Sequence, residues 1–244
     1  MVQWEISRQQ VAISGLIINA QTQKPMGNVL VTLTDAPSAF VTKLLTRIQL
    51  VAIPAAQQAA FQEVLDATAN AAKLVAIQKL LLLLPASLVQ TILPKRLDQT
   101  YSAPDGHFYF LDLPDGKYAL TASLANFGSR YGTAQAKNIT VKRDADGKIT
   151  AANPDAIQLP PTTLKGKITA QSGGDNIVLA EIRVQGSGEA TFSNQEGDYV
   201  LTELETSSEK RVIEVKAPGF QSAEKQISLN KEGSEKTLDF ALKK

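Results

Sequence analysis

The sequence predicts a mainly β protein made of two β-sandwiches in tandem, the first of which carries an inserted α-helical hairpin. Three observations predict this fold class: short alternating segments between Gly, Pro and Asp-Gly turns, one alanine- and leucine-rich block with helical spacing, and a return of the opening pattern after that block. The predicted domains are a first sandwich formed by residues 1–35 and 100–160, a helical insertion over residues 36–99, and a second sandwich over residues 161–244.

The first predicted strands lie between Val11 and Leu33. ISGLIINA alternates apolar with small or polar residues, TQKPMGN supplies a turn, and VLVTLT is rich in β-branched residues. The character changes after Asp35, where apolar residues take the spacing of one helix face at Phe40, Val41, Leu44, Leu45, Ile48 and Val51.

The remainder of the insertion is also helical in pattern. Pro54 ends or kinks the first helix, and the alanine-rich run AAQQAAFQEVLDATANAAKLVAIQKLLLLL follows with strong helix formers throughout. Pro85 interrupts this run, and ASLVQTIL forms a last short piece before Pro94. The pattern favours an antiparallel hairpin with a short third helix.

Strands resume at residue 100, where two PDG turns enclose one short segment. Asp-Gly favours a turn because glycine tolerates positive φ and aspartate bonds its own backbone. We expect Phe108, Phe110 and Leu113 to point into one core and the next strand to follow with Tyr118, Leu120 and Ala122. A further pair of strands is predicted around the Asp-Gly turn of KNITVKRDADGKIT.

The second sandwich repeats the first after the stiff segment LPPTT. LKGKITAQSGGDNIVLAEIRVQG follows the plan of ISGLIINAQTQKPMGNVLVTLTD, ATFSNQEGDYVLTEL that of TYSAPDGHFYFLDL, and RVIEVKAPGF that of YALTASLANFG. This is an internal duplication of one β unit, and only the first copy contains the helical block.

These residues resemble the carboxypeptidase regulatory-like domain family, which consists of small transthyretin- or prealbumin-like, Ig-like β-sandwiches. The first copy matches the family pattern at Gly15, Ile17, Pro25, Gly27, Val29, Val31, Gly106, Phe108, Phe110, Leu113, Gly116, Tyr118, Leu120 and Phe127. The second copy matches at Gly166, Ile168, Ile182, Val184, Asn194, Gly197, Tyr199, Leu201, Leu204, Val212, Val215, Gly219 and Phe220, and ETSSEKR replaces its glycine turn. The resemblance implies a fold, whereas such domains serve many unrelated functions.

Composition excludes several classes of function. The 244 residues include 25 basic and 24 acidic side chains, for a net charge of +1, so no nucleic-acid partner is expected. There are no cysteines, which excludes disulfides, thiolate metal sites and a cysteine nucleophile. The start MVQWEISRQQVAISG lacks a signal-peptide pattern, and the longest uncharged apolar stretch, residues 80–94, is too short to span a bilayer. We therefore expect a cytoplasmic protein without a transmembrane segment.

The sequence offers a candidate catalytic triad and a candidate calcium site, and each has a simpler structural explanation. His107, the only histidine, could join Ser102 with Asp105 or Asp112 in a catalytic triad, but an exposed strand histidine is favoured. The turn aspartates and the DADG segment at residues 144–147 could bind calcium, but no ligand spacing fits and turn chemistry is favoured. We predict no catalytic, cofactor or metal site.

The leucines of the insertion have two interpretations. They pack within the helices and onto the first sandwich, or part of them meets another subunit or a membrane face. The second interpretation makes this insertion a docking element, which also permits a homo-oligomer formed through it. The candidate docking residues are Leu80, Leu81, Leu84, Leu88, Ile92 and Leu93.

The predicted function is that of a non-enzymatic structural or adaptor subunit that binds other protein subunits. Because related sandwiches usually work outside the cell, an accessory component of a phage-tail-like contractile particle, made in the cytoplasm and then exported or released, is the specific expectation. The alternative is a surface or glycan-binding adhesion module, for which the candidate aromatic residues are Trp4, Tyr101, Tyr109 and Tyr131. A third hypothesis, a hydrolase built around His107, is disfavoured.

Overall fold

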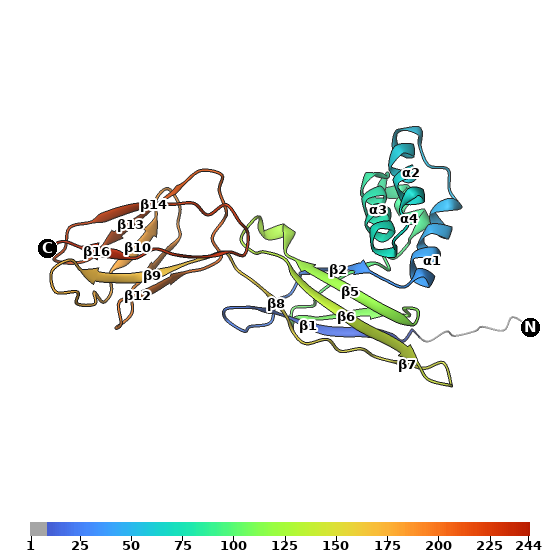
Figure 1. Cartoon of the computed structure of the whole chain (residues 1–244), viewed down its shortest axis with the longest axis horizontal. Helices are drawn as coiled ribbons and strands as arrows, with labels where there is room; N and C mark the ends of the chain where they lie inside the picture. The colour runs from blue at the N-terminus through green and yellow to red at the C-terminus, as the bar shows by residue number, and fades with distance from the viewer. Residues whose placement is uncertain (1–8) are drawn as a thin grey trace, which may run out of the picture. The chain divides into compact units, whose positions relative to one another are not determined.

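The computed structural model describes residues 9–244, which form two compact units (Figure 1). The first unit extends to residue 18 and includes residues 24–122 and 134–157, while the second consists of residues 19–23, 123–133 and 158–244. Most regular structure is β, as the sequence predicts, and the four α-helices found among the described residues all belong to the first unit. The division differs from the predicted domains in three short segments, 19–23, 123–133 and 158–160, which belong to the second unit.

The first unit is a sandwich of two sheets. One has the strand order β4-β1-β8 and the other the order β3-β2-β5-β6-β7, and β8 crosses the division between the units. The strands are β1 (Val11–Asn19), β2 (Leu30–Asp35), β3 (Gln99–Tyr101), β4 (His107–Leu111), β5 (Gly116–Ser123), β6 (Ala134–Arg143), β7 (Ile149–Thr150) and β8 (Ile157–Leu159).

The segment between the two PDG turns is strand β4, and its side chains alternate as predicted. Phe108 and Phe110 are buried and meet edge to face, with ring centroids 6.3 Å apart, while His107 and Tyr109 lie on the exposed side. Leu113 is buried as well. The alternation arises because successive side chains of a strand point to opposite faces of the sheet.

The insertion contains four α-helices and not the predicted hairpin with a third piece. They are α1 (Ser38–Gln49), α2 (Gln58–Asp66), α3 (Asn70–Leu83) and α4 (Ala86–Ile92), with a 3-10 turn η1 (Ala55–Gln57) before α2. The long alanine-rich run is divided because Ala67 is extended, with ψ 124°. The DATAN segment there is rich in Asp, Thr and Asn, which are weak helix formers.

The helical insertion packs on the second sheet of its own unit, beside β2 (Figure 1). Phe40 of α1 meets Tyr118 of β5 edge to face, with ring centroids 6.2 Å apart, and both side chains are buried. The Gln78 amide of α3 donates a 2.8 Å hydrogen bond to the Leu33 carbonyl of β2. The insertion is therefore part of the core of the first unit.

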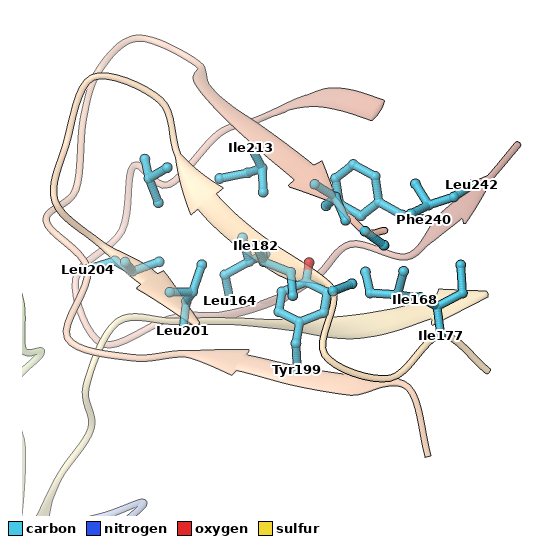
Figure 2. Close-up of a cluster of buried hydrophobic side chains, with 14 of the residues drawn as sticks. Leu164, Ile168, Ile177, Ile182, Tyr199, Leu201, Leu204, Ile213, Phe240 and Leu242 are labelled. Atoms are coloured by element: carbon cyan, nitrogen blue, oxygen red, sulfur yellow. The ribbon is translucent and has the colours of Figure 1, made fainter. Parts of the chain in front are cut away.

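The second unit is a sandwich of the same kind. Its sheets have the orders β11-β10-β13-β14 and β12-β9-β15, with β16 also pairing with β9. Its strands are β9 (Thr163–Ala170), β10 (Glu181–Val184), β11 (Ala190–Phe192), β12 (Asp198–Leu201), β13 (Arg211–Lys216), β14 (Ala223–Ile227), β15 (Glu235–Thr237) and β16 (Phe240–Leu242), and the 3-10 turn η2 (Ala125–Phe127) also belongs to this unit. Figure 2 shows the core, where Tyr199, Ile182, Ile213 and Phe240 meet among aliphatic side chains.

The two sandwiches repeat each other at the level of single contacts. Gly15 pairs with Phe108, and Gly166 pairs with Tyr199, so each early glycine faces an aromatic residue of the neighbouring strand. A Cβ atom at Gly15 would meet the Phe108 ring at 2.5 Å, and one at Gly166 would meet the Tyr199 ring at 2.9 Å. Glycine is required at position 15 by the close approach of the Phe108 ring, and at position 166 first by the Leu238 carbonyl, which lies still nearer than the Tyr199 ring.

A buried serine closes the same turn in both sandwiches. The Ser102 hydroxyl donates to the Met26 carbonyl at 2.7 Å and accepts the Val29 N–H at 3.0 Å. The Ser193 hydroxyl donates to the Ile177 carbonyl at 2.7 Å and accepts the Ala180 N–H at 2.9 Å. We call this arrangement the serine clamp; it demonstrates in three dimensions the duplication predicted from the sequence.

Candidate functional site

The predicted docking leucines mostly face inward. Leu80, Leu81, Leu84, Ile92 and Leu93 are buried, and Leu88 is partly buried. These side chains help to form the core of the first unit, so the five buried ones present no surface to a partner in this structure. A docking role for the insertion would require other residues.

Helix α3 exposes a different set of apolar side chains. Leu74, Ile77, Leu80 and Leu81 of this helix are buried, whereas Val75, Leu82 and Leu83 are 52%, 80% and 52% exposed. We call Val75, Leu82 and Leu83 the α3 outer face. A helix that is apolar on all sides is normally buried on all sides, and α3 departs from this rule along its outer face.

An ion pair holds α3 against α2 next to this face. The Lys79 ammonium lies 2.8 Å from the Glu63 carboxylate, and both side chains are more than half exposed. Lys79 lies between Val75 and Leu82 on the helix, so one polar side chain interrupts the α3 outer face. A surface pair of this kind adds little stability, on the order of 0–1 kcal/mol.

The residues of the hypothetical triad are not brought together. The Ser102 hydroxyl is buried and occupied by the serine clamp, whereas His107 is exposed and stacks on Tyr109, with ring centroids 6.4 Å apart. The Asp105 carboxylate accepts the backbone N–H of His107 and that of Asp112 accepts the backbone N–H of Gln10. The geometry supports the interpretation of His107 as an exposed strand residue.

The turn aspartates hold backbone and arginine groups. Asp144 accepts the N–H groups of Asp146 and Lys148 at 3.0 and 2.8 Å, which closes the DADG turn. Asp115 binds the Arg143 guanidinium at 2.5 Å. Within residues 9–244, no group of three His, Asp or Glu side chains is arranged to hold a metal ion.

The candidate aromatic residues lie in different environments. Tyr101 and Tyr109 are 53% and 47% exposed, whereas Tyr131 is buried, and Trp4 lies outside the described residues. Burial raises the pKa of the Tyr131 hydroxyl well above its usual value, with the Glu203 carboxylate adding to the effect. Tyr131 is therefore a core residue of the second unit and is not available for stacking on a ligand.

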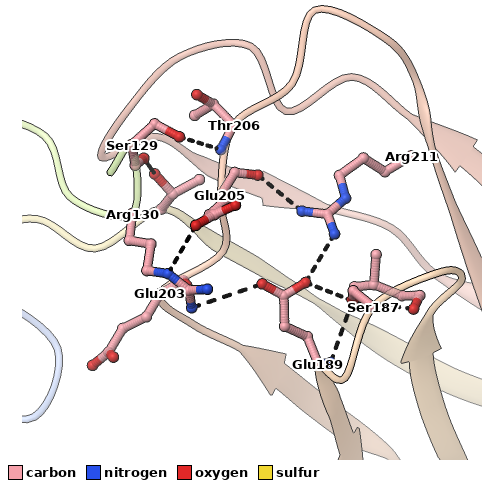
Figure 3. A network of polar contacts seen from close by, with 10 residues as sticks. Ser129, Arg130, Ser187, Glu189, Glu203, Glu205, Thr206 and Arg211 are labelled. Carbon is pink, nitrogen blue, oxygen red and sulfur yellow. Dashed lines mark hydrogen bonds and ion pairs between the residues drawn. The ribbon is translucent and has the colours of Figure 1, made fainter. Parts of the chain in front are cut away.

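A polar network in the second unit escaped the sequence analysis (Figure 3). The Glu189 carboxylate binds the Arg211 guanidinium at 2.9 Å and the Ser187 hydroxyl at 2.7 Å, and it lies 3.8 Å from the Arg130 guanidinium. Arg130 also lies 3.4 Å from the Glu205 carboxylate and donates to the Glu203 carbonyl. Arg130 comes from segment 123–133, so the network joins this segment to the rest of the second unit, together with the backbone hydrogen bond from the Thr162 N–H to the Arg130 carbonyl.

Two tyrosines mark the centres of the two sandwiches. The Tyr118 hydroxyl donates to the Pro114 carbonyl at 2.7 Å, and the Tyr199 hydroxyl donates to the Leu238 carbonyl at 2.6 Å. Burial raises the pKa of both hydroxyls well above the usual value of a tyrosine.

Among the described helices, none is long and apolar enough to cross a membrane.

Several solved structures are similar to the chain at low identity. A type II cohesin–X-dockerin complex from Acetivibrio cellulolyticus aligns over 32% of this chain and 51% of the matched chain, with 12% identity and a TM-score of 0.28. GBS52, the minor pilin of Streptococcus agalactiae, aligns over 98% and 96%, with 13% identity and a TM-score of 0.32. The shaft pilin SpaA from Lactobacillus rhamnosus GG aligns over 97% of both chains, with 10% identity and a TM-score of 0.37. The match therefore spans about half the length of the cohesin–X-dockerin chain, and at these TM-scores the likenesses carry no weight for function.

The sequence comparisons concern the second sandwich. No curated protein matches the chain. The family model of the carboxypeptidase regulatory-like domain matches residues 163–243, which run from the first residue of β9 to one residue beyond β16. The resemblance predicted from Gly166, Tyr199 and the following strands is confirmed: the second sandwich of this chain is similar to the carboxypeptidase regulatory-like domains.

Proposed function

We propose that this protein is a non-enzymatic structural subunit that joins an assembly through the α3 outer face. The observation that carries the proposal is the exposure of Val75, Leu82 and Leu83 on a helix whose opposite face is buried in the first unit. Removing a large apolar side chain from water contributes up to about 1.5–3 kcal/mol. Three side chains of this kind on one helix face, with Lys79 between Val75 and the two leucines, are a suitable centre for a protein–protein interface.

The packing of the insertion supports its use as a docking platform. Phe40 and Gln78 fix the helices to β5 and β2, so the α3 outer face is presented by a rigid support. A preorganised surface loses little conformational entropy when a partner binds. Other protein subunits are the expected partners, and a second copy of this chain is one that the test below can detect.

The specific assembly proposed is a contractile, phage-tail-like particle, in which this chain is an accessory component. This choice reconciles a sandwich type that usually works outside cells with the cytoplasmic synthesis expected from the sequence. The test is purification of the endogenous protein from its native source under gentle conditions, followed by mass spectrometry of the copurifying proteins. Sheath, tube or baseplate proteins are expected. Recovery of the chain without them would exclude this assembly and leave the general structural role open.

A glycan-binding adhesion module is the second candidate. The exposed rings of Tyr101 and Tyr109 favour it, because flat aromatic faces stack on sugar rings, and His107 already stacks on Tyr109. A glycan array with the full chain tests this candidate. Signals that disappear in Tyr109→Ala would support glycan binding, and an array without signal above background would exclude it.

A further inference from the structure

A cleft of about 160 Å³ in the first unit is lined by an unusual excess of basic side chains. Its walls come from α1, from the segment that follows α4, and from the end of β4. The basic residues that line it are Lys43, Arg47, Lys95 and Arg96, and the only acidic residue among the lining residues is Asp112. The chain as a whole has a net charge of only +1, so the excess is local.

Within residues 9–244, three of the four cations have no partner. The Arg96 guanidinium binds the buried Asp98 carboxylate through two 2.7 Å hydrogen bonds, which neutralise it. Lys43, Arg47 and Lys95 form no ion pair or hydrogen bond within the described chain, residues 9–244. Lys43 and Arg47 are four residues apart on α1, where like charges repel each other, so an anion between them would relieve this repulsion.

The floor of the cleft is the edge of a sheet. In the order β4-β1-β8, β4 is the outer strand, and its residues Tyr109 and Leu111 line the cleft. An extended chain can add to such an edge through main-chain hydrogen bonds. Half-buried Leu97 and Leu111 offer apolar contacts between the cations.

We propose that this cleft binds an extended acidic segment of a protein partner, with glutamate or aspartate carboxylates on Lys43, Arg47 and Lys95. Lysine and arginine form charge-assisted hydrogen bonds with carboxylates, and a free strand edge selects a peptide over an isolated anion. The cleft shares no residue with the α3 outer face, so the proposal does not depend on the proposed function.

The test uses the full chain and a fluorescein-labelled decapeptide in which glutamate alternates with valine, measured by fluorescence anisotropy. We expect saturable binding that weakens at least tenfold in Lys43→Gln/Arg47→Gln, and weakens as ionic strength rises. The matched control is Lys137→Gln/Lys142→Gln, which removes the same charge from exposed positions of β6 and should change the affinity less than twofold. A peptide with glutamine in place of glutamate should not bind.

Three results would overturn the proposal. The first is no binding of the acidic peptide, and the second is an equal loss in the cleft variant and the β6 control. The third is a competition experiment in which the inhibition constant of inorganic phosphate is lower than the dissociation constant of the peptide. The site would then be one for free phosphate. If Lys43→Gln/Arg47→Gln melts at a lower temperature than the wild type, Lys95→Gln provides the same comparison outside α1. Val75→Glu/Leu82→Glu should bind the peptide normally, which separates this site from the α3 outer face.

Discussion

Ser102 and Ser193 hold the two ends of the same turn in their sandwiches, although they lie 91 positions apart in the chain. Each hydroxyl uses its donor and its acceptor on backbone groups more than ten residues away in sequence. A small polar residue in a β turn region looks exposed in the sequence, because the partners of its hydroxyl are distant in the chain. This is why the serine clamp could not be predicted, whereas Gly15, Phe108, Gly166 and Tyr199 could be recognised in the sequence as repeated motif positions.

Replacing either clamp serine by alanine should destabilise the unit that contains it. Ser102→Ala leaves the buried N–H of Val29 without its acceptor, and Ser193→Ala does the same to Ala180. A buried donor left unsatisfied costs about 1–3 kcal/mol. Urea denaturation should show this loss for both variants and no comparable loss for Ser172→Ala, whose side chain is exposed. Wild-type stability in both clamp variants would show that the clamp does not hold the turns.

Leu179 occupies a backbone conformation that suits another residue. Its φ is 57° and its side chain is 68% exposed, while Asn28, at the matching place in the first sandwich, has a φ of 60°. The left-handed region costs a leucine about 1–2 kcal/mol, and asparagine adopts it more readily. Leu179→Asn should therefore raise the stability of the second unit by about 1 kcal/mol, and Asn28→Leu should lower that of the first.

The measurement for this pair is the urea midpoint at constant m-value. A lower midpoint for Leu179→Asn would mean that the leucine contributes more by packing than it loses by strain. Equal midpoints for Asn28→Leu and the wild type would contradict the conformational explanation directly.

At the scale of elements, the strands could be predicted more fully than the helices. Alternation and Asp-Gly turns placed β4 and β5 because each residue's face follows from a period of two. The helical block was recognisable as helical, but its division between α2 and α3 depends on two residues with extended backbone, Ala67 and Ala69. Leu80 and Leu82 are both leucines in an unbroken apolar run, so periodicity could not tell which is buried and which is exposed.

The insertion stabilises the first sandwich. If residues 37–97 are replaced by a short Gly-Ser loop, the buried ring of Tyr118 loses its contact with Phe40, and β2 loses the helix above it. Loop closure itself changes little in free energy, so the loss of packing decides the outcome. Calorimetry of the shortened chain should show a lower-melting first unit and an unchanged second unit.

Two outcomes would contradict this expectation. An unchanged melting temperature of the first unit would mean that the helices contribute no stability to the sandwich. A loss of the second transition would mean that the second unit depends on the insertion.

At the scale of the whole molecule, we expect the free energy of unfolding of both units to decrease over the same alkaline pH range. Burial raises the pKa of Tyr118 and of Tyr199, whereas a tyrosine in the unfolded chain ionises near pH 10. Well below pH 10 these two tyrosines are protonated in both the folded and the unfolded state, so they add no pH dependence to stability there. As the pH rises past 10, the unfolded chain releases protons first, so stability falls by up to about 1.4 kcal/mol per pH unit for each tyrosine until the folded group also ionises.

Denaturation monitored by far-ultraviolet circular dichroism between pH 8 and pH 12 measures this slope. Tyr199→Phe removes one of the two buried ionisable tyrosines of the second unit, the other being Tyr131, and should make the alkaline slope of this unit shallower, at the cost of the hydrogen bond to Leu238. The same alkaline slope in wild type and Tyr199→Phe would assign the base sensitivity to other groups.

The duplication itself could be predicted because both copies preserve the same glycines and aromatic residues. The boundary between the units could not, since it depends on Arg130 reaching Glu189 and Glu205, which lie 59 and 75 positions away in sequence. The same holds for the basic cleft, whose cations come from α1 and from the segment after α4. Sites built from distant segments become visible only when the chain is folded.

The most direct test of the central claim is the native mass of the protein in an extract of its source, determined for the wild type and for Val75→Glu/Leu82→Glu. The wild type should migrate in a complex far larger than its own 26.2 kDa, and the variant should remain folded but migrate at its own mass. Ser87→Glu/Gln90→Glu, which places two acidic residues on exposed positions of α4, is the matched control and should enter the complex. A folded Val75→Glu/Leu82→Glu protein in the large complex, or a wild type found only at 26.2 kDa, would contradict the account.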